Sequence, residues 1–351
     1  MTDTNTASGG GTDSTTPDHP TAPDTAKDGP PRPARVRRDA LTIALDNIVW
    51  ALIVVFSLVT GALNAFFLTT ANLQNILIQA TSLGLLVLAV SFALLIGEID
   101  LSVTGNLAFS GMVGALLIQH LHMPGLLAIL CTIATGTVIG LVNGVFVALW
   151  KMHSLITTLA MGLFLQGAVL AVTKARTLVI DDGVFTWLGS ATVGDWPVMP
   201  LALIAAYAVA AVVLTRTVWG RNLYATGGSP GAALVAGIAV NRVRLSAFAA
   251  AGTLGGLAGF LSSTYLGAVN VTTGSSLLLY AVAAPVIGGV SLTGGRGRVT
   301  GMLGGAVLLS VIQVGLQLVN LSAYDVQMIG GAMILVAIAV DTVRVRRTER
   351  G

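Results

Sequence analysis

The chain has 351 residues, of which 54% are hydrophobic and only 9% are charged, and its mean hydropathy is +0.86. A soluble domain carries about 25% charged residues, because its surface faces water. This composition excludes a water-soluble globule and predicts a protein embedded in a bilayer. The net charge of +3 comes from scattered Lys and Arg residues without interleaved aromatic residues, so we expect no nucleic-acid partner.

The N-terminal residues 1–45 are rich in Thr, Asp, Pro and Gly, and they lack the apolar stretch of a secretory signal. This pattern predicts a disordered cytoplasmic tail. A membrane domain is expected over residues 46–345, and residues 346–351 are expected to form a second short cytoplasmic tail.

Intervals without Asp, Glu, Lys or Arg predict the number of membrane helices, since a hydrocarbon core of ~30 Å needs about 20 apolar residues per helix. Three long intervals predict two helices each and four shorter ones predict one each, which gives an all-α bundle of ten transmembrane helices. The seven intervals are 47–97, 101–150, 152–173, 196–215, 245–295, 299–324 and 326–340.

The distribution of positive charge predicts the orientation of this bundle. With ten crossings and a cytoplasmic N-terminus, the C-terminus is cytoplasmic too, and Lys174 and Arg176 are the only two of the 18 Lys and Arg residues that fall outside. This asymmetry is the one that the positive-inside rule requires. Glycines at four-residue spacing, such as Gly136 with Gly140 and Gly252 with Gly256, predict close helix packing.

The sequence lacks the residues that ion coupling, nucleotide binding and metal binding require. The predicted span centres hold no charge, which argues against a stand-alone carrier or channel with a charged coupling site or ion ring. No Lys follows a glycine in a phosphate-binding loop, and the His residues and single Cys form no ligand cluster. We therefore expect no cofactor, no metal and no enzymatic activity.

One short polar segment interrupts the apolar pattern. Residues 97–104 read Gly-Glu-Ile-Asp-Leu-Ser-Val-Thr, with two carboxylates between long apolar runs. Asp100 or Ser102 in a simple turn that caps the next helix would also account for it. The segment resembles the G-x-I-D-L-S-V-G signature of sugar-type permeases of ATP-binding-cassette (ABC) importers, the ribose and xylose group, with Thr104 in place of the usual glycine. The signature residues are Glu98, Asp100 and Ser102.

Further motifs extend this resemblance over nearly everything after the tail. They are residues 143–145, 155–159, 220–228, 232–233, 237–238, 241–243 and 287–297. The resemblance implies a permease in the cytoplasmic membrane of a bacterium, paired with a second copy or a close paralogue. It also implies ABC ATPase subunits, an extracytoplasmic sugar-binding protein and a simple sugar as substrate. A nucleoside, an autoinducer-like sugar derivative or a branched-chain amino acid is the alternative cargo.

Residues 218–244 are the predicted cytoplasmic coupling segment, in which Pro230 to Ile238 form a short helix that docks on an ATPase. An ordinary cytoplasmic loop would explain its arginines but not its glycine pattern. The predicted coupling residues are Gly220, Arg221, Asn222, Thr226, Gly227, Gly228, Ala232, Ala233 and Gly237.

A sugar that crosses the bundle needs uncharged polar groups along its path, because it loses hydrogen bonds to water. The candidates are Asn106, Asn143, Thr157, Gln166, Asn270 and Gln313. Hydrogen bonds between helices explain such amides equally well. We expect weak contacts in this path, with selectivity supplied by the binding protein, which is expected to dock on the outer loop from Lys174 to Asp195.

Overall fold

The computed structural model describes residues 10–11, 40–270 and 272–319, together with scattered positions between 322 and 335. Most of the tail at 1–45, most of the predicted span at 326–340 and the tail at 346–351 lie outside the described residues. The helices are α1 (Ala40–Leu63), α2 (Thr70–Leu95), α3 (Val103–Leu121), α4 (Gly125–Gly144), α5 (Ser154–Thr173), α6 (Gly183–Ser190), α7 (Met199–Arg216), α8 (Val218–Gly228), α9 (Pro230–Val235), α10 (Val240–Leu266), α11 (Leu278–Ile287) and α12 (Val299–Leu318). Short helical segments are η1 (Ala65–Leu68), η2 (Val145–Leu149, a π-helix) and η3 (Ser275–Leu277).

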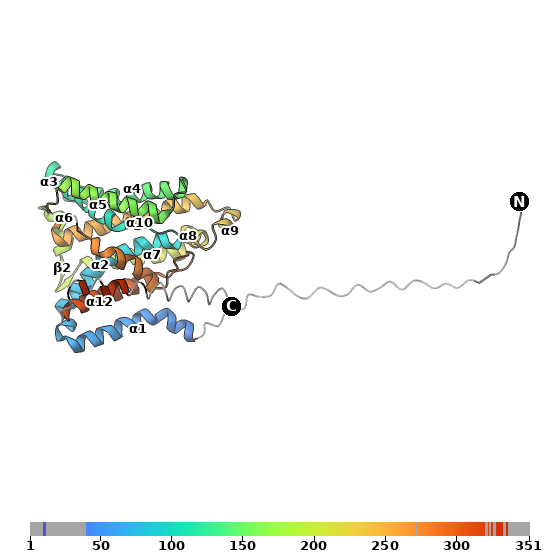
Figure 1. Ribbon diagram of the computed structural model, residues 1–351, viewed down its shortest axis with the longest axis horizontal. Coiled ribbons are helices and arrows are strands. Elements are labelled where there is room, and N and C mark those ends of the chain that lie inside the picture. Colours follow the sequence, from blue (N-terminus) through green and yellow to red (C-terminus); the bar gives the residue numbers. More distant parts are fainter. Residues whose placement is uncertain are drawn as a thin grey trace.

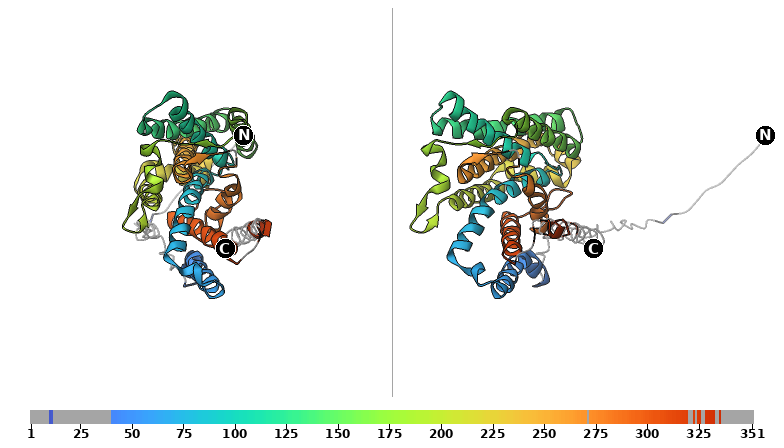
Figure 2. Two further views of the ribbon diagram at one scale, coloured as in Figure 1. Left: turned by 90° about the vertical axis from the view of Figure 1, so that its left-hand side faces the viewer. Right: turned by 60° about the vertical axis from the view of Figure 1, so that its left-hand side comes forward.

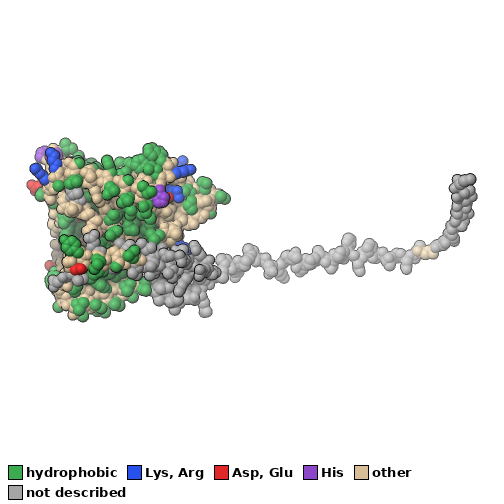
Figure 3. Space-filling view, in the orientation of Figure 1, with side chains coloured by type: hydrophobic (Ala, Val, Ile, Leu, Met, Phe, Trp, Pro, Cys, Tyr) green, Lys and Arg blue, Asp and Glu red, His purple; other side chains and the backbone are tan. Residues whose placement is uncertain are grey.

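The long helices run side by side, so the bundle has two ends (Figure 1). One end carries α9 and is called the α9 end; the opposite end carries α6 and is called the α6 end. Figure 2 turns the bundle and shows that α1 lies at its periphery. Hydrophobic side chains cover much of its length, while Lys and Arg side chains gather at the ends (Figure 3).

The core forms around α2 and α10. The most apolar stretch of α2 is 78% buried, because this helix is hydrophobic on all sides and other helices surround it. It packs against α7, α10, α11 and α12, and α10 in turn packs against α3 and α4.

Glycines let α4 and α10 approach closely, which confirms the predicted packing faces. A Cβ atom on Gly136 would lie 2.5 Å from the carbonyl oxygen of Gly252 and 2.5 Å from Cα of Gly256. On Gly140 it would overlap the carbonyl oxygen of Phe248. Only glycine leaves room for the facing backbone at these positions.

The long described helices lie largely within the predicted intervals, whereas the shorter α6, α8 and α9 lie between them. Six of them are long and apolar enough to cross a membrane, namely α2, α4 with η2, α5, α7, α10 and α12. The all-α membrane bundle is therefore confirmed, whereas the count of ten crossings stays a prediction.

The second helix of the 245–295 interval is shorter than expected. The apolar helical stretch Ser275–Ile287 spans ~20 Å at ~1.5 Å per residue, less than a ~30 Å hydrocarbon core. Strand β4 (Ala268–Val269), which pairs with β1 (Leu178–Val179), takes up part of this interval. Asn270 then forms a turn, because its Oδ1 accepts hydrogen bonds from Thr272 N and Thr273 Oγ1.

The expected loop between α5 and α7 also has structure of its own. It contains β1, α6 and a hairpin of β2 (Thr192–Val193) and β3 (Trp196–Pro197). Asp182 caps α6 by accepting a hydrogen bond from Phe185 N at 2.7 Å. The buried Phe185 ring packs edge-on against Phe260 of α10, with 5.1 Å between ring centroids, so α6 is anchored to the bundle.

Candidate functional site

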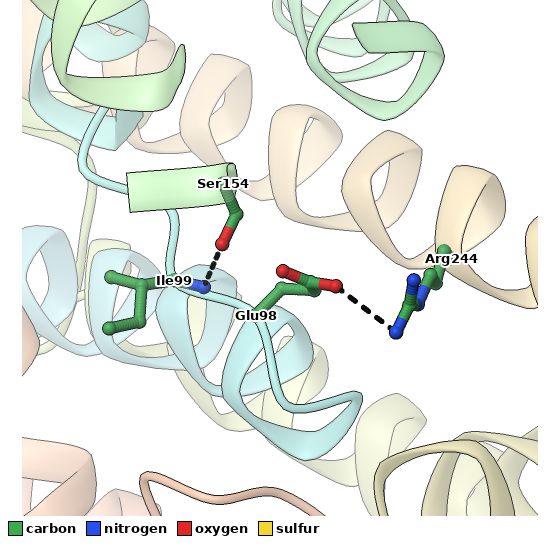
Figure 4. A network of polar contacts seen from close by, with 4 residues as sticks. All are labelled: Glu98, Ile99, Ser154 and Arg244. Carbon is green, nitrogen blue, oxygen red and sulfur yellow. Dashed lines mark hydrogen bonds and ion pairs between the residues drawn. The ribbon is translucent and has the colours of Figure 1, made fainter. Parts of the chain in front are cut away.

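The segment that connects α2 to α3 is fixed by hydroxyl groups of α5. Ile99 N donates a hydrogen bond to Ser154 Oγ at 3.3 Å (Figure 4). Thr158 Oγ1 accepts a hydrogen bond from Leu101 N at 3.0 Å and donates one to the Ile99 carbonyl at 3.2 Å. The backbone polar groups of this connection are thus satisfied by a helix more than fifty residues away in sequence.

Asp100 is buried in the same connection. Its Oδ1 accepts hydrogen bonds from Ser102 N at 2.8 Å and from Ser102 Oγ at 2.6 Å, and Asn143 Nδ2 donates to Ser102 Oγ at 2.7 Å. Burial raises the pKa of the Asp100 carboxyl, and the hydrogen bonds from Ser102 partly oppose this shift. Ser102 precedes α3 without making a side-chain cap. Of the two capping alternatives, it is the Asp100 carboxylate that accepts a backbone N–H at the start of α3, from Ser102 itself.

Glu98 pairs with Arg244 of α10. Its Oε1 lies 3.3 Å from Nη2 of Arg244, as Figure 4 shows. Both side chains are largely buried, with 14% of Glu98 and 25% of Arg244 exposed. The two neighbouring carboxylates of the signature therefore have different partners: one holds a local turn and the other joins two distant segments.

Three backbone segments meet beside this connection at Gly97, Gly227, Gly294 and Gly295, called here the glycine junction. Gly97 and Gly294 have left-handed φ angles of 76° and 89°. A Cβ on Gly227 would overlap the Leu95 carbonyl and lie 2.6 Å from Gly295 N. Gly295 N itself donates a hydrogen bond to the Leu95 carbonyl at 3.0 Å. The end of α2, the end of α8 and the turn before α12 are thus in direct backbone contact.

Helix α8 is joined to the bundle by two aromatic residues. Trp219 Nε1 donates to Ser246 Oγ of α10 at 2.7 Å, and its ring lies 5.6 Å from that of Phe92 in α2. Tyr224 Oη donates to the Gly297 carbonyl at 3.0 Å. Gly220 packs against the end of α7, since a Cβ there would lie 2.5 Å from the Val213 carbonyl oxygen. These contacts join α8 to α2, α7, α10 and the turn before α12.

The short helix expected after Pro230 is present as α9. Ser229 caps it by accepting a hydrogen bond from Ala232 N at 3.3 Å, and Pro230 occupies its first turn. Ala233 is buried, whereas Leu234 and Val235 are 67% and 91% exposed. Helix α9 lies at one end of the bundle (Figure 1), and its apolar side chains Leu234 and Val235 are exposed there.

The predicted coupling residues divide by burial. Gly220, Thr226, Gly227 and Ala233 are buried and Asn222 is half-buried, while Arg221, Gly228, Ala232 and Gly237 are exposed. The buried residues hold α8 and α9 to the bundle, and the exposed residues lie on the surface of α8 and α9 that faces away from it.

The six polar residues proposed for the path lie in separate environments. Asn106 Nδ2 donates to the carbonyls of Gly136 and Gly252, each at 3.2 Å, and so joins α3 to the α4–α10 contact. Thr157 Oγ1 donates to the His153 carbonyl, and Asn270 shapes the turn after β4. Gln313 hydrogen-bonds Tyr280.

Asn143 and Gln166 differ from the other four. Asn143 is fully buried, and its Oδ1 has no hydrogen-bond partner within the described part of the chain. Gln166 is half-buried on α5. The described structure does not gather the six residues in one cavity.

Comparison with known proteins places the whole arrangement in a family. Residues 72–338 match the family described as the permease component of the branched-chain amino acid transport system. The L-arabinose ABC transporter permease protein of Azospirillum brasilense is 33% identical over 91% of this chain and 93% of its own length. The ribose import permease protein of Haemophilus influenzae is 35% identical, over 83% of this chain and 91% of its own length.

The D-allose transport system permease protein of Escherichia coli is 33% identical over 79% of this chain and 85% of its own length. No solved structure matches the chain. The relatives are transport subunits rather than enzymes, and the helices described above fit a multi-pass protein of the bacterial cytoplasmic membrane. The chain therefore belongs to this permease family, as a membrane subunit of an ABC transporter.

Proposed function

We propose that this chain forms the translocation path of an importer for a simple sugar, a pentose or a hexose. The similarity to permeases named for arabinose, ribose and allose supports this substrate class, since it extends over most of each chain. A sugar-binding protein delivers the substrate, and separate ATPase subunits drive its passage.

The observation that carries the coupling proposal is the exposed apolar tip of α9. Leu234 and Val235 are well exposed on a helix whose neighbour α8 is fixed to α2 and α10. An exposed apolar surface on a rigid support is typical of a protein interface. The positive-inside rule favours a cytoplasmic α9 end, because Lys151, Arg216, Arg221 and Arg242 lie there. An ATPase would therefore reach α9.

In this proposal the glycine junction transmits the motion. A displacement of α9 moves α8, and α8 bears directly on the end of α2 through Gly227. The adjacent connection is held by Ser154, Thr158 and the Glu98–Arg244 ion pair, so its position is coupled to α5 and α10. Packed elements of this kind shift between discrete arrangements rather than deform gradually.

Exposed surfaces indicate where the second permease copy and the binding protein contact this chain. Helix α5 is the least buried of the six long apolar helices, at 28%, and we place the second permease copy against it. Gln166, which is half-buried on α5, then borders the path. The binding protein docks at the α6 end, where Trp187 and Trp196 are exposed.

The test is uptake into proteoliposomes that contain the chain with its co-purifying ATPase. Candidate binding proteins are added with a panel of pentoses, hexoses, nucleosides and amino acids. ATP-dependent uptake of one sugar is the expected result. Uptake of a nucleoside or an amino acid instead would show that the substrate is not a sugar. Uptake without an ATPase would show that the chain is a carrier or channel and would refute the coupling proposal.

A further inference from the structure

A cavity of about 490 Å³ lies at the α9 end, beside the Glu98–Arg244 ion pair. Its wall is formed by the α2–α3 connection, the turn between η2 and α5, the start of α10 and the turn before α12. The lining side chains that carry charge or hydrogen-bonding groups are Glu98, Lys151, His153, Ser154, Asn241 and Arg244. The proposed path does not include this cavity.

Positive charge dominates its wall. Lys151 and Arg244 are cationic, and Glu98 is the only carboxylate among the described residues that line the cavity. One oxygen of Glu98 already pairs with Arg244 Nη2. Nε of the same guanidinium is buried and offers no donor to the cavity. The Lys151 ammonium makes no ion pair or hydrogen bond among the described residues. The cavity therefore holds a cationic donor that its own acceptors do not satisfy, and such a group favours an anion.

The backbone of the turn adds to this positive potential. Helix α5 begins at Ser154, and His153 before it makes no side-chain cap, so the first N–H groups of a 20-residue helix face this region uncapped. A helix N-terminus carries about half a positive charge and binds oxyanions. Lys151 lies in this turn with a left-handed φ of 57°. Residues that carry a side chain rarely adopt this conformation.

From these observations we infer that the cavity binds a phosphate group, carried either by an anionic phospholipid or by a soluble compound. Phosphate presents several acceptor oxygens to the donors of Lys151, Arg244 and the first turn of α5. Exposed apolar side chains flank the same turn: Trp150 at 67%, Met152 at 46% and Ile156 at 65%. Tryptophan and apolar residues at this position suit the headgroup level of a bilayer, where basic pockets bind lipid phosphates.

The test measures the melting temperature of the full chain in neutral detergent. One arm adds sodium phosphate against sodium chloride at equal ionic strength, and the other adds short-chain phosphatidylglycerol against phosphatidylcholine. A bound ligand raises the melting temperature with its concentration, which gives an apparent Kd. A rise with phosphatidylglycerol alone identifies the lipid headgroup as the source, and a rise with inorganic phosphate identifies a soluble compound.

Three variants assign the effect to the cavity. Lys151→Gln should weaken binding about tenfold or more, because it removes a charged hydrogen bond. Lys174→Gln is the matched control, since Lys174 has a similar left-handed φ of 52° just after the other end of α5. Glu98→Gln should strengthen binding by about two- to fivefold, since it removes a competing carboxylate. A damaged fold would not produce this gain.

The inference does not depend on the sugar proposal, because the assay contains neither a sugar nor an ATPase. The absence of a shift with both probes would overturn it. Equal effects of Lys151→Gln and Lys174→Gln would overturn it too.

Discussion

Gly227→Ala is expected to disturb the contact between the coupling segment and the bundle. A Cβ at this position would overlap the Leu95 carbonyl and lie 2.6 Å from Gly295 N. Both groups are backbone atoms, so α8 must move away. Overpacking of this kind costs about 1–3 kcal/mol. Loss of the hydrogen bond from Gly295 N to the Leu95 carbonyl adds about 1–3 kcal/mol. Better helix propensity returns about 1 kcal/mol, so the net loss is about 1–5 kcal/mol.

The adjacent Gly228 provides the control. It belongs to the same helix, is exposed, and a Cβ there would meet nothing within 4 Å. Gly228→Ala should therefore keep or slightly raise the melting temperature, because alanine favours the helix. The assay combines thermal unfolding in detergent with ATP-driven uptake. Gly227→Ala should lower both the melting temperature and the uptake per ATP hydrolysed. Equal melting temperatures and equal uptake for the two variants would show that Gly227 is not in close contact with Leu95 and Gly295.

Three further predictions test other parts of the account. Val235→Asp should abolish ATPase binding in a pull-down without a change in melting temperature, because this side chain is 91% exposed; full binding would contradict it. Burial raises the pKa of Asp100 above its ordinary value of about 3.9, so protonation stabilises the native state as the pH falls towards this value. The melting temperature of the chain should therefore rise as the pH falls. Asp100→Asn should remove this rise, and a variant with the same pH dependence as the original chain would contradict the assignment to Asp100. Asn106→Ala should destabilise the fold by about 1–2 kcal/mol without altering which sugar is transported, since its amide joins helices; a changed substrate preference would return it to the path.

Much of the fold follows from the sequence, because two simple physical constraints act along the whole chain. The length of a bilayer-spanning helix fixes where helices fit between charges, and glycine spacing marks where they approach closely. Both constraints are local in sequence. They fail for the 245–295 interval, where the turn at Asn270 and strand β4 replace part of a helix without adding a charge. They fail again for α6, whose cap at Asp182 is hidden in a polar stretch.

The site is less accessible to sequence reasoning, because its contacts are distant in the chain. Glu98 and Arg244 both stand out as charges near apolar runs, yet nothing local indicates that they pair across 146 positions. The glycine junction is similar: Gly97, Gly227 and Gly294 each belong to a recognisable motif, but their contact depends on how α2, α8 and the last turn pack. Residue type alone identifies the polar residues of the predicted path. It does not separate Asn106, which lies in a helix contact, from Asn143, whose Oδ1 has no partner among the described residues.

We propose that α9 is the surface through which an ATPase drives this bundle. Photo-crosslinking tests this proposal, with a crosslinker placed at position 235 on α9 and, as a control, at position 193. Val193 is 70% exposed and lies in the β2–β3 hairpin near α6. With the co-purifying ATPase present, position 235 should crosslink to the ATPase and position 193 should not. A crosslink from position 193 alone, or from neither position, would contradict the account.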